Sequence, residues 1–162
     1  MAYEQLKLEN QLCFPLYACA KEVVKHYKPF LDDLGLTYTQ YIAMLALWEY
    51  GSVNVKTLGE YLYLDSGTLT PLLKKLEQHG LITRERSGAD ERNVLVQLTK
   101  AGIAMEKQAS EIPEKMRLCL SLTKSEAETL YGLLYQVLGQ MQPTADNHAE
   151  CSQKPCNTVL EP

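Results

Sequence analysis

Residues 64–77 read Leu64-Asp65-Ser66-Gly67-Thr68-Leu69-Thr70-Pro71-Leu72-Leu73-Lys74-Lys75-Leu76-Glu77, which is the pattern of a short amphipathic helix. Asp65 or Ser66 suits an N-cap, and Gly80 suits the first residue beyond the last turn. The stretch therefore predicts a helix with both ends marked. Its leucines recur at the i, i+3, i+4 and i+7 spacing that turns one face toward a core, and they are Leu69, Leu72, Leu73 and Leu76.

The opposite face of this helix carries small polar side chains and cations. Such groups can reach base edges and phosphates when a helix lies in the major groove of DNA. Pro71 removes one internal hydrogen bond, which favours a helix start shaped for contact rather than for stability. The residues predicted to contact DNA are Ser66, Thr68, Thr70, Pro71, Lys74 and Lys75.

A second helix is predicted directly before the first. Residues 56–64 place Leu58, Tyr61 and Leu62 on one helical face. Only a few residues separate this segment from the next helix, which is the spacing of a helix-turn-helix. The two segments together predict a DNA-binding pair of helices.

A β-hairpin is predicted to follow Gly80. Residues 82–86 and 94–96 alternate in polarity, and residues 87–90 between them suit a turn. The tip of this hairpin would form a wing beside the helix pair. Arginines in a wing can meet phosphate or enter a minor groove, and a nearby carboxylate can hold an arginine in place. The predicted wing contacts are Arg84, Arg86 and Arg92, with Asp90 holding Arg92.

The charge balance favours placement of cations over bulk attraction. The chain has 16 lysines and arginines against 20 aspartates and glutamates, a formal net charge of −4, whereas nucleic-acid binders usually present a basic face. A leucine-striped helix followed by a polar hairpin also occurs in domains that bind no nucleic acid. DNA contact here therefore depends on where the cations lie, and two copies of the chain would strengthen it.

Length and cysteine content narrow the class of protein. A chain of 162 residues suits one modest domain. Residues 1–7 lack the apolar run of a signal peptide, and no stretch reaches the roughly 18 apolar residues of a membrane span, so the cytoplasm is the expected location. In that compartment an odd set of five cysteines favours redox-active thiols over a disulfide scaffold. No cofactor and no membrane partner are predicted.

Residues 65–77, together with Asp90-Glu91-Arg92-Asn93 in the wing, resemble the winged-helix core of the MarR family, the multiple antibiotic resistance regulators. Leu12-Cys13-Phe14 and Leu36-Thr37-Tyr38-Thr39-Gln40-Tyr41 resemble its peroxide-sensing branch, the organic hydroperoxide resistance repressors. The likeness runs from about residue 11 to about residue 113. It implies a homodimeric bacterial repressor rather than an enzyme, with an organic hydroperoxide as signal and a pseudo-palindromic double-stranded operator as partner.

We expect a mainly α fold with a small β-hairpin wing. Its expected parts are an N-terminal dimerisation and sensor helix (1–36), a winged helix-turn-helix (37–99), C-terminal dimerisation helices (100–142) and a disordered tail (143–162).

Within residues 100–142, two helices are expected. Thr99 suits the cap of a first helix that bends or stops at Ile112-Pro113, and residues 123–126 suit a capping box before a second. The apolar stripe of the second helix suits either a partner helix or an internal core. Its members are Ala127, Leu130, Leu133, Leu134, Val137, Leu138 and Met141.

The peroxide-sensing residue implied by the resemblance is Cys13. Its segment has apolar and aromatic residues at helical spacing, so the thiol shares the core stripe, where a cysteine is most often a small hydrophobe. A reactive sulfur must be a thiolate, which nearby donors, cations or a helix N-terminus stabilise. In the resembling family two tyrosine hydroxyls donate to this sulfur, and the matching positions here are Tyr27 and Tyr38. Packing alone is the alternative role for these two rings.

A second thiol is needed to complete the oxidation. A hydroperoxide converts a thiolate to a sulfenic acid, which condenses with a nearby thiol or goes on to irreversible acids. Cys19 lies nearly opposite Cys13 on a helix, so the two are not expected to meet. In two-cysteine members of the resembling branch, the resolving thiol lies in the region of Cys119 and bridges to the other subunit. One-cysteine members use a small external thiol instead.

Two other functions fit parts of the sequence. A ligand-responsive regulator would keep the winged helix but bind a small aromatic compound between the dimer helices and the DNA-binding lobe, leaving Cys13 as packing. A thiol peroxidase would use Cys13 catalytically, but the chain lacks a thioredoxin-like alternation of strands and helices. In the tail, His148, Cys151 and Cys156 are too loosely spaced for a structural metal site, so no metal is predicted.

Overall fold

The computed structural model describes residues 3–87 and 90–141, with the side chains of residues 86–93 outside the description. The chain divides into two compact units. The larger is Glu22–Met116, which contains the predicted helix-turn-helix and hairpin. The other consists of the two ends of the chain, Met1–Lys21 and Arg117–Pro162.

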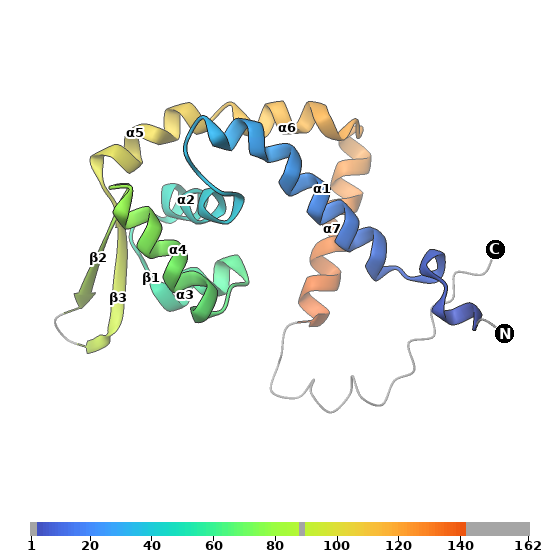
Figure 1. The fold of residues 1–162 in the computed structure, drawn as a ribbon, viewed down its shortest axis with the longest axis horizontal. Coiled ribbons are helices and arrows are strands. Elements are labelled where there is room, and N and C mark those ends of the chain that lie inside the picture. The colour runs from blue at the N-terminus through green and yellow to red at the C-terminus, as the bar shows by residue number, and fades with distance from the viewer. Residues whose placement is uncertain (1–2, 88–89, 142–162) are drawn as a thin grey trace. The chain divides into compact units, whose positions relative to one another are not determined.

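Helices dominate the structure, and a small sheet accompanies them (Figure 1). The predicted mainly α fold with a hairpin wing is confirmed. Two 3₁₀ turns precede the first α-helix, η1 (Glu4–Leu6) and η2 (Leu8–Asn10). The strands are β1 (Val53–Asn54), β2 (Ile82–Ser87) and β3 (Asp90–Leu98). The α-helices are α1 (Cys13–Asp32), α2 (Tyr38–Tyr50), α3 (Val55–Leu62), α4 (Ser66–Gln78), α5 (Lys100–Ala109), α6 (Ile112–Leu120) and α7 (Lys124–Met141).

The helix-turn-helix predicted from the sequence is α3 followed by α4. Asn54 caps α3 by accepting from the backbone N–H of Thr57 at 2.8 Å, and Asp65 caps α4 by accepting from that of Thr68 at 2.9 Å. Of the two candidate caps in the sequence, Asp65 is the one used. Tyr63 makes the turn in the left-handed region (φ 54°), which is uncommon for a bulky residue. Caps on both helices hold this turn in place.

The leucine stripe of α4 faces the core as predicted. It packs with Tyr41, Met44 and Leu47 of α2 and with Leu58 of α3. Burying a leucine side chain contributes about 1.5–3 kcal/mol, so the cluster fixes which face of α4 remains outside. The four stripe residues are each at most 7% exposed, and they are Leu69, Leu72, Leu73 and Leu76.

The sheet is antiparallel and has the strand order β1-β3-β2. β2 and β3 form the predicted hairpin, in which Ile82 lies opposite Leu98. β1 was not predicted, because its two residues are too few to show an alternation. It pairs with β3 through Val53 opposite Val96, which ties the beginning of the helix-turn-helix to the wing.

The helices after the sheet begin at the predicted caps. Thr99 accepts from the backbone N–H of Gly102 at 3.1 Å, which caps α5. Thr123 accepts from the N–H of Glu126 at 3.3 Å, while the Glu126 carboxylate accepts from the N–H of Thr123 at 2.8 Å. This reciprocal pair is the capping box expected before α7.

The break between α5 and α6 falls slightly earlier than predicted. α5 ends at Ala109, and the residue pair Ile112-Pro113 begins α6 instead of ending the preceding helix. Proline is tolerated in a first helical turn, because the N–H that it lacks would have no partner inside the helix there. No helix within residues 3–87 or 90–141 is long and apolar enough to cross a membrane.

Candidate functional site

The outer face of α4 presents the residues that the sequence singled out for DNA contact. Because the leucines of α4 are buried, its polar residues are left on the accessible side. The structure therefore brings together on one exposed helix Ser66, Thr68, Thr70, Pro71, Lys74 and Lys75.

The threonine hydroxyls on this face already donate their protons within the helix. Thr68 Oγ1 donates to Asp65 Oδ2 at 2.9 Å, and Thr70 Oγ1 donates to the carbonyl of Ser66 at 2.7 Å. The hydrogen bonds from Thr68 hold the pKa of the Asp65 carboxyl below its ordinary value. Each threonine oxygen keeps acceptor capacity toward solvent, which suits the exocyclic amino groups of adenine and cytosine in a major groove.

Arg84 of the wing binds α4. Its Nε and Nη2 both donate to Glu77 Oε2, at 3.0 and 2.5 Å, and this hydrogen bonding holds the pKa of Glu77 below its ordinary value. The guanidinium therefore fastens β2 to α4, a role that the sequence did not reveal, and its contact with DNA stays a prediction. The side chains of Arg86, Asp90 and Arg92 lie outside the described residues.

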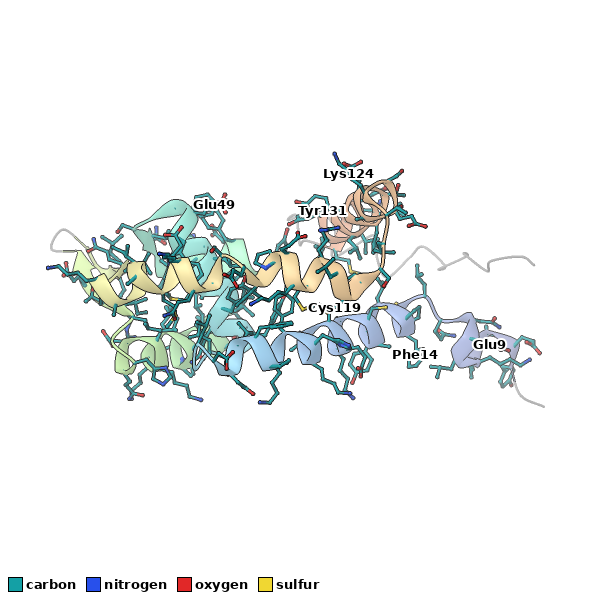
Figure 2. The ribbon with its side chains drawn as sticks, turned by 90° about the horizontal axis from the view of Figure 1, so that it is seen from above. Glu9, Phe14, Glu49, Cys119, Lys124 and Tyr131 are labelled. Atoms are coloured by element: carbon teal, nitrogen blue, oxygen red, sulfur yellow. The ribbon has the colours of Figure 1, made fainter. Side chains whose placement is uncertain are left out.

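Three cysteines lie in the described part of the chain, and all three are exposed. Cys13 is the first residue of the 20-residue helix α1, whereas the sequence placed it on a stripe facing the core. Cys119 lies near the end of α6 (Figure 2), and Cys19 lies further along α1.

Tyr27 and Tyr38, the predicted thiolate donors, lie side by side in the unit Glu22–Met116. Their ring centroids are 5.0 Å apart. Burial raises the pKa of both phenols, and the neighbouring Tyr38 adds to the rise at Tyr27. Both groups therefore keep their protons at neutral pH and can donate hydrogen bonds. The structure brings these two predicted residues together.

Two further aromatic residues extend this pair, and the sequence predicted no functional role for either of them. Tyr41 lies 5.8 Å from Tyr27 between ring centroids, and Trp48 lies 6.5 Å from Tyr41. The indole Nε1 of Trp48 donates to the carbonyl oxygen of Gly102 at 2.9 Å. The available signal was the helical spacing of positions 38, 41 and 48, which is equally typical of core packing.

Replacing Tyr41 with phenylalanine is expected to flatten the alkaline loss of stability. Burial raises the pKa of Tyr41 to about 12, with smaller contributions from Tyr27 and Tyr38. The folded state holds the phenol proton of Tyr41 more tightly than the unfolded state does. The contribution of this difference to the free energy of unfolding is therefore complete below pH 10 and is lost as pH rises toward 12. Two pKa units correspond to about 2–3 kcal/mol. Urea unfolding of both proteins between pH 9 and 11.5 measures the difference, and parallel pH profiles would contradict it.

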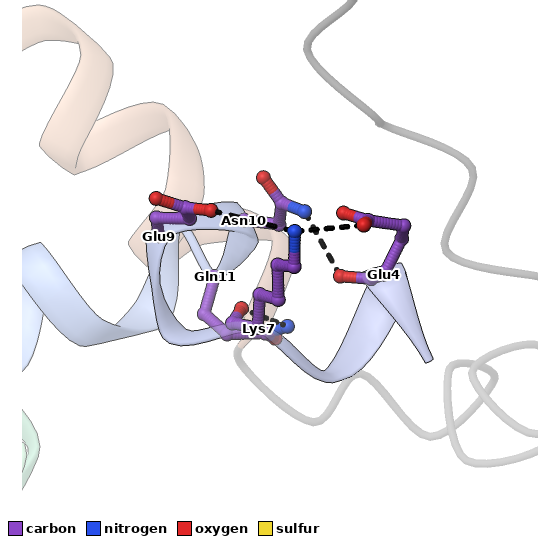
Figure 3. A network of polar contacts seen from close by, with 5 residues as sticks. All are labelled: Glu4, Lys7, Glu9, Asn10 and Gln11. Carbon is purple, nitrogen blue, oxygen red and sulfur yellow. Dashed lines mark hydrogen bonds and ion pairs between the residues drawn. The ribbon is translucent and has the colours of Figure 1, made fainter. Parts of the chain in front are cut away.

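The segment before Cys13 is fastened by its own polar network (Figure 3). Lys7 Nζ lies 2.7 Å from Glu4 Oε1 and 3.9 Å from Glu9 Oε1. Asn10 donates to the carbonyl of Glu4 at 2.9 Å, and Gln11 donates to that of Gln5 at 2.6 Å. Exposed ion pairs contribute little stability, so the backbone contacts matter most for holding η1 and η2 together ahead of α1.

The prediction of no metal concerned His148, Cys151 and Cys156, which lie outside the described residues. Among the residues whose side chains are described, histidine, cysteine and carboxylate groups do not gather in threes as a metal site would require.

Comparison with known proteins supplies relatives for this arrangement. Residues 25–116 match the family described as transcriptional regulator SarA/Rot. The organic hydroperoxide resistance transcriptional regulator of Bacillus subtilis (strain 168) is 52% identical over 139 residues, which is 84% of this chain and 92% of the relative. The HTH-type transcriptional regulator SarZ of Staphylococcus epidermidis (strain RP62A) is 42% identical over 130 residues, which is 80% of this chain and 88% of the relative.

Solved structures of AbfR are similar in fold. AbfR of Staphylococcus epidermidis is 36% identical with a TM-score of 0.69, covering 85% of this chain and 95% of that one. Reduced AbfR bound to DNA matches at 34% identity and 0.71, covering 86% and 96%. Overoxidized AbfR bound to DNA matches at 34% and 0.70, covering 86% and 98%. Disulfide-formed AbfR matches at 35% and 0.60, covering 83% and 95%.

Proposed function

Because the chain belongs to the SarA/Rot type of MarR-like winged-helix transcriptional regulators, we propose that it is a homodimeric repressor that releases its operator when an organic hydroperoxide oxidises Cys13. The observation that carries the proposal is an exposed thiol at the first residue of α1, in a chain 52% identical to an organic hydroperoxide resistance regulator. The protein acts where its operator lies, in the bacterial cytoplasm.

The recognition step uses the outer face of α4. This helix enters the major groove, where the threonine oxygens meet base edges and Lys74 and Lys75 meet phosphates. A two-fold axis then presents two such helices to half-sites about one turn of DNA apart. A pseudo-palindromic operator follows from that symmetry.

The dimer surface is formed by the helices at the chain ends. Every residue of α7 is exposed or half-buried, although the helix carries a long apolar stripe. Leu133 and Tyr131 of α7 are 55% and 63% exposed, and Leu118 of α6 is 66% exposed. Contiguous apolar surface of this kind marks an interface, and a second copy of the chain would cover it.

The two phenols act on the sulfur of the partner protomer. Positions 13 and 27 lie on one α-helix, and at 1.5 Å per residue they are separated by about 21 Å. A hydrogen bond needs about 3 Å, so Tyr27 cannot donate to Cys13 of its own protomer. Tyr27 and Tyr38 of one protomer therefore stabilise the Cys13 thiolate of the other, as neutral donors that bring no cation into the interface.

The chemistry proceeds in two steps. The Cys13 thiolate attacks the outer oxygen of the hydroperoxide, the O–O bond breaks, and with one proton taken up the products are a sulfenic acid and an alcohol. A second thiol then displaces water from the sulfenic acid and forms a disulfide. We assign that thiol to Cys119 of the partner protomer. Reduction by a cellular dithiol returns the two thiols and restores repression.

The disulfide form releases the operator, whereas a form in which Cys13 is oxidised to an acid without a disulfide does not. AbfR has been solved on DNA in both its reduced and its overoxidized form, and separately with its disulfide formed. A disulfide holds the Cα atoms of the two bonded cysteines, and so their helices, within about 7 Å of each other. An oxygen atom added to one sulfur imposes no such restraint. Only the cross-link therefore forces movement of the scaffold that carries α4.

The test compares three forms of the protein on one duplex, selected from genomic DNA by the reduced protein. Mass spectrometry after proteolysis identifies which sulfurs have joined, and fluorescence anisotropy gives the affinity of each form. We expect the disulfide form to bind roughly 5–150-fold more weakly, the usual range of allosteric coupling, and the reduced and overoxidised forms to bind alike. Equal affinity of the reduced and disulfide forms contradicts the proposal.

Replacing Lys74 and Lys75 together with alanine is expected to reduce the salt dependence of operator binding. Each phosphate contact contributes about 0.9 to the slope of log affinity against log salt concentration. Removing four lysines from a dimer therefore lowers the slope by about 3.6. Anisotropy titrations between 50 and 200 mM salt measure it, with Lys28→Ala on α1, paired to Asp32 at 2.6 Å, as control. An unchanged slope removes these lysines from the interface.

A further inference from the structure

A row of aromatic rings runs through the unit Glu22–Met116, from the sensor phenols to the far end of α2. Tyr38 and Tyr27 begin the row, Tyr41 continues it at 5.8 Å from Tyr27, and Trp48 ends it at 6.5 Å from Tyr41. Tyr41 is only 1% exposed, so its ring is enclosed by a protein interior, which is close-packed. A displacement of Tyr27 must therefore be taken up by its neighbours in this row.

The row ends on a backbone hydrogen bond to another helix. Trp48 Nε1 donates to the carbonyl oxygen of Gly102 in the first turn of α5, at 2.9 Å. Tyr27 lies in α1, Tyr41 and Trp48 lie in α2, and Gly102 lies in the first turn of α5, the helix that follows the wing. The contacts thus connect the consecutive helices α1 and α2 with α5, which is distant from them in sequence.

The beginning of α5 is in turn fastened to the end of α4. A Cβ atom at Gly102 would lie 2.1 Å from the carbonyl oxygen of Leu81, so the two backbones touch at this point. Thr99 donates its N–H to that same oxygen at 3.0 Å and its hydroxyl to the carbonyl of Gly80 at 2.6 Å. Gly80 and Leu81 lie between the C-cap of α4, His79, and the first residue of β2, Ile82, so a shift of the start of α5 moves the joint between α4 and the wing.

We propose that Trp48 is the positioning residue that couples the sensor phenols to the DNA-binding face, through the hydrogen bond from its indole N–H to Gly102. This inference rests on the proposed function, because it assumes that disulfide formation takes the sulfur away from Tyr27. When the sulfur leaves, the ring of Tyr27 adopts a new position, and Tyr41 and Trp48 pass the change to α5. Packed interiors have discrete arrangements, so the change reaches the α4–wing joint without being absorbed gradually.

The decisive variant is Trp48→Phe, which keeps an aromatic ring and removes the N–H donor. The quantity measured is the ratio of operator affinities of the reduced and disulfide forms. We expect the operator affinity of the reduced form and the yield of disulfide to stay within about twofold of the wild type. The ratio of the two affinities should fall at least fivefold, which lies within the range of allosteric coupling. Tyr50→Phe is the matched control on the same helix, since Tyr50 is half exposed and stacks on Tyr61 at 4.7 Å outside the row.

The outcomes separate this inference from the proposed function. If the wild type releases the operator on disulfide formation and Trp48→Phe releases it equally, the coupling role is overturned while the redox repressor stands. If the wild type itself keeps the operator, the proposed function fails, and the coupling role fails with it. A ratio that falls in Trp48→Phe but not in Tyr50→Phe supports the coupling role.

A second measurement needs no substitution in the row of aromatic rings. Trp48 is the sole tryptophan of the chain, so fluorescence excited at wavelengths that tyrosine does not absorb reports on this position alone. We expect disulfide formation to shift the emission or the acrylamide quenching of the wild-type protein, and hydroperoxide to leave both unchanged in Cys13→Ser. Identical fluorescence of the reduced and disulfide wild-type forms shows that the oxidation signal does not reach Trp48, and it overturns the inference.

Discussion

Replacing Cys13 with serine is expected to leave the operator occupied at hydroperoxide concentrations that clear it of the wild type. Serine is close to cysteine in size and its hydroxyl can accept hydrogen bonds, but it cannot form a sulfenic acid. The operator affinity of the variant without oxidant should therefore stay within about twofold of the reduced wild type. The weakening of binding by oxidant, roughly 5–150-fold in the wild type, should disappear in the variant. Anisotropy titrations of both proteins with and without an organic hydroperoxide measure the change.

Cys19→Ser is the matched control for this variant. Cys19 is also an exposed thiol of α1, six positions further along the same helix and about 120° away around its axis. Its replacement should leave the response to oxidant intact. Full operator release by the Cys13→Ser protein would end the sensor proposal and favour a small aromatic ligand acting between the dimer helices and the DNA-binding lobe.

The exposed face of α4 could be predicted well, because short-range rules determine it, while its contact with DNA stays a prediction. The leucine spacing of residues 69–76 sets which side of α4 is buried, and Asp65 and Gly80 mark its ends, so the exposed face follows from one helix alone. The same local logic gave the caps at Thr99 and Thr123. Each of these features depends on residues within about one turn of one another.

Features that depend on distant contacts could not be predicted. β1 is two residues long and exists because Val53 pairs with Val96 of a strand far along the chain. The bond from Trp48 to Gly102 spans 54 positions, and the pairing of Arg84 with Glu77 depends on how the wing meets α4. A stripe of aromatic residues at helical spacing reads the same whether the rings fill a core or connect two sites.

The position of Cys13 shows why burial is hard to infer from a stripe. The thiol shares the spacing of the apolar residues that follow it, yet it begins α1 and is exposed in the single chain. The stripe of α7 is exposed in the same way. Periodicity identifies a face that avoids water, but whether the cover is the same chain or a partner depends on the assembly.

Replacing Cys119 with serine is expected to abolish operator release by hydroperoxide and to make the oxidation irreversible. Without a resolving thiol, the Cys13 sulfenic acid continues to sulfinic and sulfonic acids. On the proposed function, this overoxidised form is expected to keep the operator, so affinity should change by less than about twofold. A dithiol reductant restores the Cys13 thiol of the oxidised wild type but not the Cys13 thiol of the oxidised variant.

The covalent state separates Cys119 from other candidate resolvers. On non-reducing electrophoresis, the oxidised wild type should run as a linked dimer and Cys119→Ser as a monomer, with Cys19→Ser linked like the wild type. Adding a small thiol during oxidation of Cys119→Ser should trap the sulfenic acid as a mixed disulfide before it is overoxidised, and a reductant then recovers Cys13. A linked dimer that persists in Cys119→Ser assigns the bridge to another cysteine, because a disulfide cannot form at a serine.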